Sequence, residues 1–171
     1  MKTPASIARH PLHPMLITIP VGLWIFSFVA DLVVYFSEEN GTAVLWFMIG
    51  YWTMAGGIVG ALLAAVPGFI DLLSLTEQRI RTLATTHMSI NLAVVVLYAV
   101  NFWLRTIEPP DFLTGMGLSA IGLVLLSISG WIGGEMVHVH GVGVAGHIPE
   151  DTFASDEPAR SEPSATRLGR S

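Results

Sequence analysis

Residues 44 to 66, VLWFMIGYWTMAGGIVGALLAAV, form a run without a single charged residue. A helix needs about 20 such residues to cross a hydrocarbon core of about 30 Å, because it rises about 1.5 Å per residue. Three further runs reach this length. We therefore predict four membrane spans and an all-α, integral membrane four-helix bundle, with spans at Met15–Phe36, Val44–Val66, Leu83–Leu104 and Phe112–Ile132.

The composition agrees with a membrane protein. Hydrophobic residues make up 52% of the chain and charged residues 12%, and the mean hydropathy of +0.63 lies outside the usual range of soluble domains. The first span is too long for the core of a cleavable signal peptide, which has roughly 7–15 apolar residues. Nothing in the sequence resembles a nucleophile–base pair, a phosphate-binding loop or a nucleic-acid surface, so hydrolase, kinase and DNA-binding functions are not predicted.

The distribution of basic residues predicts the orientation in the membrane. Seven of the eight lysines and arginines flank the same side of the predicted spans, and Arg105 alone lies on the other side. Cytoplasmic loops carry such an excess of Lys and Arg, so we expect both termini in the cytoplasm of a bacterium and the bundle in its cytoplasmic (inner) membrane. We expect a four-span domain over residues 1–147 and a disordered cytoplasmic tail over 148–171, where Pro, Ser and charged residues replace apolar ones.

Polar residues recur at a spacing of three and four along the predicted spans, which places them on one seam inside a bundle. In the fourth span this spacing selects Val124 and Trp131 among others. In the first and third spans it selects His13, Ile17, Pro20, Trp24, Ser27 and Asp31, and His87, Asn91, Val94, Tyr98, Asn101 and Arg105. Asp31 and Arg105 both fall at the outer end, and we predict an ion pair between them. Pro67 and Gly68 are expected to open the loop after the second span, and no internal repeat is evident.

All six histidines fall on the predicted cytoplasmic side, where ionisable groups near hydrocarbon mark a functional site by default. The chain has no cysteine, which excludes thiolate metal sites and c-type haem attachment. Candidate cofactor-binding residues are His10, His13, His87 and His140, with Asn91 orienting His87 and Arg79 and Arg81 available to haem propionates. Candidate metal ligands are His13, His87, His140, Asp71 and Glu135. Because His138 and His140 are two positions apart, only one of them is expected to face the site.

Several short motifs carry a family resemblance. They are His10-Pro11-Leu12-His13-Pro14, His87 with Asn91, Gly133-Gly134, and His140-Gly141-Val142-Gly143-Val144. Together they resemble an uncharacterised family of four-span bacterial membrane proteins, a domain of unknown function, over about residues 10 to 146. The resemblance implies this fold and His10, His13, His87 and His140 as the family-type histidines. Some relatives are joined to Rieske-type iron–sulfur or cytochrome domains, which indicates membrane redox chemistry.

The leading hypothesis is a membrane redox protein that binds one b-type haem, or a His-ligated metal, at the cytoplasmic end of the bundle and works with a redox partner protein. The lack of histidines at the outer end argues against a second haem. Two alternatives stay open. The chain could be a proton-relay or small-solute transport subunit, or a structural or assembly protein without a cofactor. The sequence leaves open the oligomeric state and whether the protein is an enzyme.

Overall fold

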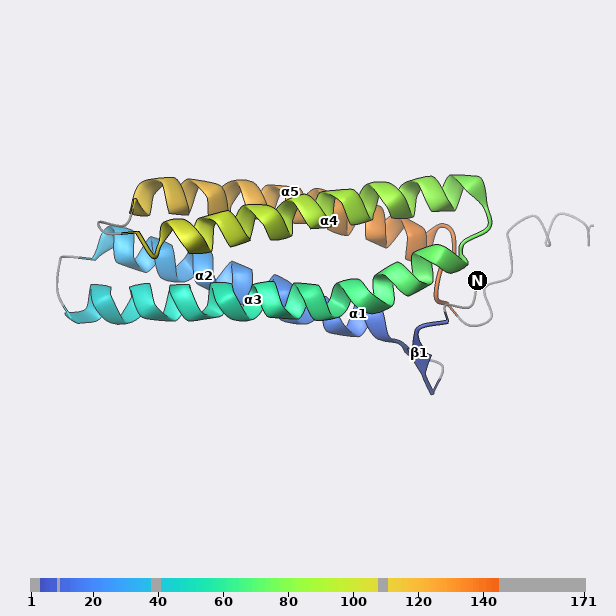
Figure 1. The fold of residues 1–171 in the computed structure, drawn as a ribbon, viewed down its shortest axis with the longest axis horizontal. Helices are drawn as coiled ribbons and strands as arrows, with labels where there is room; N and C mark the ends of the chain where they lie inside the picture. The colour runs from blue at the N-terminus through green and yellow to red at the C-terminus, as the bar shows by residue number, and fades with distance from the viewer. Residues whose placement is uncertain (1–3, 9, 38–40, 108–110, 145–171) are drawn as a thin grey trace, which may run out of the picture.

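The computed structural model describes residues 4–8, 10–37, 41–107 and 111–144. The helices lie side by side in a long bundle, preceded by a small hairpin near the N-terminus (Figure 1). The elements are β1 (Ser6–Ile7), β2 (His10–Pro11), α1 (Leu12–Leu16), α2 (Thr18–Phe36), α3 (Gly41–Ser74), α4 (Gln78–Leu104) and α5 (Phe112–His138).

Four stretches of helix are long and apolar enough to span a membrane, and α1 and α2 together form the first. Only 17–28% of the most apolar window in each is buried inside the protein, so most of the large apolar side chains face outward. In water, so much exposed apolar surface would cause association, whereas lipid solvates it. The predicted helical membrane bundle is thus observed, with one departure from an all-α chain: β1 and β2 pair as a short antiparallel ladder in which Ile7 is opposite His10.

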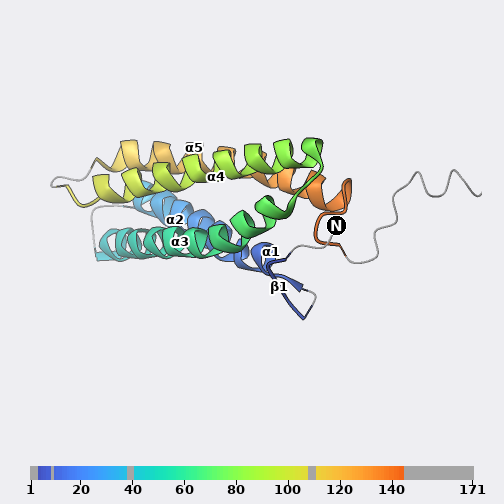
Figure 2. The ribbon, with the colours of Figure 1, turned by 45° about the vertical axis from the view of Figure 1, so that its right-hand side comes forward.

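All four spans are longer than the sequence predicted, and two of them also end later. Helix α3 continues through Pro67 to Ser74, so Pro67 does not open the loop. A proline is tolerated inside a membrane helix where neighbouring groups satisfy the loosened backbone, and here the Ala64 carbonyl accepts a hydrogen bond from His13 at 2.8 Å. The last turns of α3 bend toward α4, as expected at a proline (Figure 2). Helix α5 likewise continues to His138.

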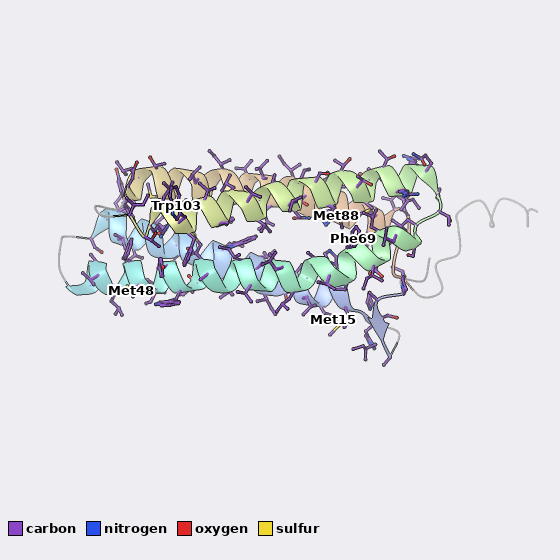
Figure 3. All side chains as sticks on the ribbon, in the orientation of Figure 1. Met15, Met48, Phe69, Met88 and Trp103 are labelled. Atoms are coloured by element: carbon purple, nitrogen blue, oxygen red, sulfur yellow. The ribbon has the colours of Figure 1, made fainter. Side chains whose placement is uncertain are left out.

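The helices associate as two pairs. Helix α2 packs mainly on α3, and α4 mainly on α5, while the pairs meet where α3 faces α4 and α2 faces α5. The α2–α3 and α4–α5 connections lie at one end of the bundle (Figure 1). We call this the ion-pair end, because Asp31 and Arg105 meet there, and the opposite end the histidine end. Figure 3 labels Met48 and Trp103 near the ion-pair end, and Met15, Phe69 and Met88 toward the histidine end.

The start of α1 and the end of α5 both lie at the histidine end, as an even number of spans requires (Figure 1). Which end faces the cytoplasm stays a prediction. The predicted tail at 148–171, Arg9 and His147 lie outside the described residues.

The predicted interior seams are confirmed for the first and third spans and wrong for the last. Trp24, Ser27, Tyr98 and Asn101 are buried. In α5, however, Val124 is 61% and Trp131 80% exposed, and the buried residues are Gly115, Ser119, Gly122 and Ser129. Small residues let membrane helices approach closely, whereas lipid accommodates large side chains. The face of α5 that packs inside the bundle is therefore set by residue size, because both faces are apolar.

Candidate functional site

Buried polar groups fill the core at the ion-pair end. Arg105 Nη1 and Nη2 donate to the two carboxylate oxygens of Asp31 at 2.7 and 2.5 Å, so the predicted ion pair is confirmed. The side chains are 2% and 0% exposed. Arg105 Nε also donates to Asn101 Oδ1 at 3.3 Å, and Asn101 Nδ2 donates to the Ser119 hydroxyl at 2.9 Å. A buried ion pair survives desolvation only with such additional hydrogen bonds, and this network supplies them.

Two aromatic rings stack in the middle of the bundle. Trp24 and Tyr98 have ring centroids 4.2 Å apart and planes that differ by 1°. Both rings press on glycines, since a Cβ at Gly57 would lie 2.4 Å from Trp24 Nε1 and one at Gly122 would lie 2.7 Å from Tyr98 Cε2. The sequence placed both aromatic residues on interior seams but did not predict the stack. Rings on different helices meet only through the relative rotation of those helices.

Two imidazoles face each other at the histidine end. His13 of α1 and His87 of α4 have ring centroids 6.1 Å apart and planes at 87°. The Nδ1 of His13 lies 2.8 Å from the Ala64 carbonyl oxygen, and the Nδ1 of His87 lies 2.8 Å from that of Ser129. A carbonyl can only accept a hydrogen bond, so Nδ1 carries the proton in both rings. The Nε2 lone pair of each ring is then the one available to a ligand.

Glycines hold each imidazole in place. A Cβ at Gly68 would lie 2.7 Å from Nδ1 of His13, and one at Gly133 would lie 3.2 Å from Cε1 of His87. Any side chain at Gly68 would therefore displace the first ring, and one at Gly133 would press on the second. These glycines fix the position of the rings on α3 and α5.

Asn91 contacts His87, as its position one helical turn later predicted. Its side-chain nitrogen lies 3.0 Å from His87 Nε2 and donates to the His87 carbonyl at 2.9 Å. Because Nδ1 holds the ring proton, the first contact is a hydrogen bond from the amide to the Nε2 lone pair. The amide therefore occupies the ligand-binding position of His87 and leaves that of His13 without a hydrogen bond in the described part of the chain.

The remaining candidate residues make contacts of their own, although Asp71 also interacts electrostatically with His13. The exposed His10 places Nδ1 2.9 Å from the Ala8 carbonyl oxygen within its own hairpin, and Asp71 accepts a hydrogen bond from the Ala5 amide at 2.9 Å. His140 Nε2 lies 4.0 Å from a carboxylate oxygen of Glu135. Arg79 and Arg81 are exposed in the first turn of α4, and the exposed His138 ends α5.

A multi-ligand metal cluster is not formed by these residues. Within residues 4–8, 10–37, 41–107 and 111–144, no three histidine or acidic side chains come close enough together to hold a metal ion. The role of Asp71, Glu135 and His140 as metal ligands stays a prediction. What the fold brings together is His13, His87 and Asn91.

Four apolar spans around a line of buried polar and aromatic groups define a multi-pass helical membrane protein. The chain belongs to the family described as predicted membrane protein (DUF2231), whose model matches residues 9–146. This match confirms the family resemblance drawn from the histidine and glycine motifs. No curated protein and no solved structure matches the chain.

Proposed function

We propose that this protein is an electron carrier of the bacterial cytoplasmic membrane that binds one b-type haem between His13 and His87. The observation that supports the proposal is the pair of facing imidazoles, each fixed through Nδ1 by a carbonyl of a neighbouring helix. Histidines that bind metals in proteins are oriented in this way, because the hydrogen bond at one nitrogen sets the tautomer and leaves the other nitrogen as the ligand.

The spacing of the two rings fits a shared ion. An ion bound to one nitrogen of each imidazole at about 2.0 Å would hold the two nitrogens about 4 Å apart and the ring centroids about 6 Å apart. The observed centroid distance is 6.1 Å. Little movement of α1 relative to α4 would then be needed for both rings to serve as ligands.

The number of available ligands favours haem over a non-haem metal. A non-haem ion bound in a protein usually takes three or more side chains, whereas haem iron takes four nitrogens from its porphyrin and at most two from the protein. Among the described residues, the histidine end offers the two imidazoles but no group of three histidine or acidic side chains that could hold a metal ion. Two protein ligands are enough to bind haem iron but fewer than a non-haem ion usually takes.

Neighbouring residues have separate tasks in this proposal. Asn91 would have to release His87 Nε2 for a ligand to bind there, and its hydrogen bond to the His87 carbonyl would keep it close. Arg79 and Arg81 lie about 9–12 Å from His87 along α4 and are available to pair with propionates. A bound haem would supply one-electron exchange, and the surrounding protein would set its potential. A redox partner protein on the cytoplasmic side would exchange the electron.

Spectroscopy of the detergent-purified protein tests the proposal. After expression with haem and metals supplied, the parent should show a Soret band and one haem per chain. His87→Ala and His13→Ala should each lose it, and both should keep a cooperative thermal transition, which separates loss of a ligand from loss of the fold. Asn91→Leu removes the competing amide at similar volume and should keep the haem.

His138→Ala is the matched control, because His138 is an exposed histidine at the same end of the bundle. It should bind haem as the parent does. A parent protein that carries neither haem nor stoichiometric metal would overturn the redox proposal. A proton-relay or purely structural role for the two histidines would then replace it.

A further inference from the structure

The contacts that hold the two histidines are the same in both helix pairs. His13 bonds to the Ala64 carbonyl and packs on the glycine four positions further along α3, and His87 bonds to the Ser129 carbonyl and packs on the glycine four positions further along α5. The two histidines are 74 positions apart. Their carbonyl partners are 65 positions apart, and so are the two glycines.

The aromatic stack repeats these offsets. Trp24 Nε1 donates to the Met54 carbonyl at 3.3 Å, and the Tyr98 hydroxyl donates to the Ser119 carbonyl at 3.3 Å. Again the donors are 74 positions apart and the acceptors 65. The glycines beneath the two rings, which lie on α3 and α5, also differ by 65 positions.

A third pair of contacts follows the same rule nearer the ion-pair end. Ser27 donates to the Gly50 carbonyl at 2.8 Å, and Asn101 donates to the Gly115 carbonyl at 2.8 Å. All four residues are buried. Each of these three hydrogen bonds joins the first helix of a pair to the second, and each recurs in the other pair at the same offsets of 74 and 65 positions. Two unrelated helix pairs would not be expected to share all three.

Equivalent residues of the two pairs also touch each other. His13 faces His87, Trp24 stacks on Tyr98, and Asp31 pairs with Arg105, always with an offset of 74. Two equivalent residues can contact each other only if they lie beside a twofold axis that relates the two units. Because the first helix of each pair starts at the histidine end, the two units run in the same direction and the axis lies along the bundle, parallel to the membrane normal (Figure 1).

We infer that residues 13–73 and 87–138 are two copies of one two-helix unit that dock on each other across this axis, and that the Asp31–Arg105 pair makes unlike copies dock. The inference does not depend on a cofactor. If two first units paired in this geometry, two carboxylates would meet at the ion-pair layer, and two second units would bring two guanidinium groups together. Like charges in a buried site are strongly unfavourable, so the pair excludes both alternatives.

An exchange of one buried layer between the units tests the inference in the full chain. The layer comprises three equivalent pairs, namely Ser27 with Asn101, Asp31 with Arg105, and Met54 with Ser119. The full exchange is the six-residue variant S27N, D31R, M54S, N101S, R105D and S119M. Rotation about the twofold axis places each residue of this layer at the position of its equivalent. The full exchange should therefore rebuild the ion pair and its hydrogen bonds, with the arginine on the first unit and the aspartate on the second.

The half exchange S27N, D31R and M54S is the control, because it brings a second guanidinium against Arg105. Its thermal midpoint in detergent should fall by about 10 °C or more. The full exchange, despite twice as many substitutions, should restore most of that loss. If the full exchange is as unstable as the half exchange, the two positions in each pair are not equivalent and the inference is wrong.

Discussion

The two ends of the bundle differ in how completely their polar groups are used. At the ion-pair end, Asp31 and Arg105 are almost fully buried. Arg105 also donates a hydrogen bond to Asn101, and the Ser119 hydroxyl donates one to Asp31. At the histidine end the rings are half-buried, and Nε2 of His13 has no hydrogen-bond partner among the described residues. A closed network stabilises the fold, whereas an open acceptor beside a second imidazole can bind something else. The comparison assigns a structural role to the ion-pair end, and the proposed haem site lies at the histidine end.

The largest expected effect is at the ion-pair end. Asp31→Asn leaves the Arg105 guanidinium buried without its counter-charge, which typically costs about 3–5 kcal/mol. We expect a clear fall of the thermal midpoint in detergent and an unchanged haem content per folded protein. Glu77→Gln, at an exposed position without a side-chain cap, serves as the control and should stay within about 0.5 kcal/mol of the parent. An Asp31→Asn variant as stable as the parent would contradict the structural assignment.

A substitution at the histidine end should show the opposite pattern. Gly68→Ala places a Cβ 2.7 Å from His13 Nδ1, so the ring must turn away from the Ala64 carbonyl. Loss of an orienting hydrogen bond typically weakens a bound metal about 10–100-fold, while the lost bond itself contributes only about 0.5–1.5 kcal/mol to stability. Haem titration and thermal melting of the same sample measure both quantities.

Gly134→Ala is the matched control for this substitution, since a Cβ there meets nothing within 4 Å. It should bind haem with the affinity of the parent. If Gly68→Ala lowers stability strongly and leaves haem affinity unchanged, His13 is a structural residue and the contrast between the two ends is lost.

The smallest effect concerns Asp111, an exposed charge at the ion-pair end. Its carboxylate caps α5 by accepting a hydrogen bond from the Thr114 amide at 3.1 Å. Hydrogen bonding with Thr114 lowers the pKa of Asp111 below its usual 3.8. The stabilisation is therefore fully present above pH 3.8 and is lost as the pH falls through the lower pKa of the folded state.

At neutral pH, Asp111→Asn should melt close to the parent, because asparagine also caps helices. Below pH 3.8 the parent should lose this stabilisation while the variant does not. Thermal midpoints measured from neutral to acidic pH should show the parent losing stability relative to the variant only in acid. Parallel curves over the whole range would mean that the capping carboxylate makes no pH-dependent contribution.

Much of the fold and one polar contact at each end follow from local sequence properties. Span length and hydropathy located all four membrane helices, and the charge of Asp31 and Arg105 at matching depths predicted their pairing. The contact between His87 and Asn91 was equally accessible, because residues four apart on a helix are neighbours in any fold. Each of these predictions depends on the sequence of a single helix or on the depth of a residue in the membrane.

The repeat was hidden from the sequence because its two helices have different offsets. The distance between equivalent residues falls from 74 positions in the first helices to 65 in the second ones, because the first unit has longer helices at the ion-pair end. Helix α2 continues past Asp31 to Phe36, whereas α4 ends at Leu104, before Arg105. The residues beside the axis also differ between the units, with Asp31 opposite Arg105 and Trp24 opposite Tyr98. No single period is left for a sequence comparison to detect.

The sequence by itself determined the class of protein, the number of spans and the residues able to carry chemistry. Only the tertiary structure decided that His13 and His87, out of six histidines, face each other, and that α5 buries its small residues and not Trp131. The physical reason is that hydropathy sets the depth of a helix in the membrane but not its rotation. Rotation follows from which surfaces pack most closely, and that is a property of helix pairs.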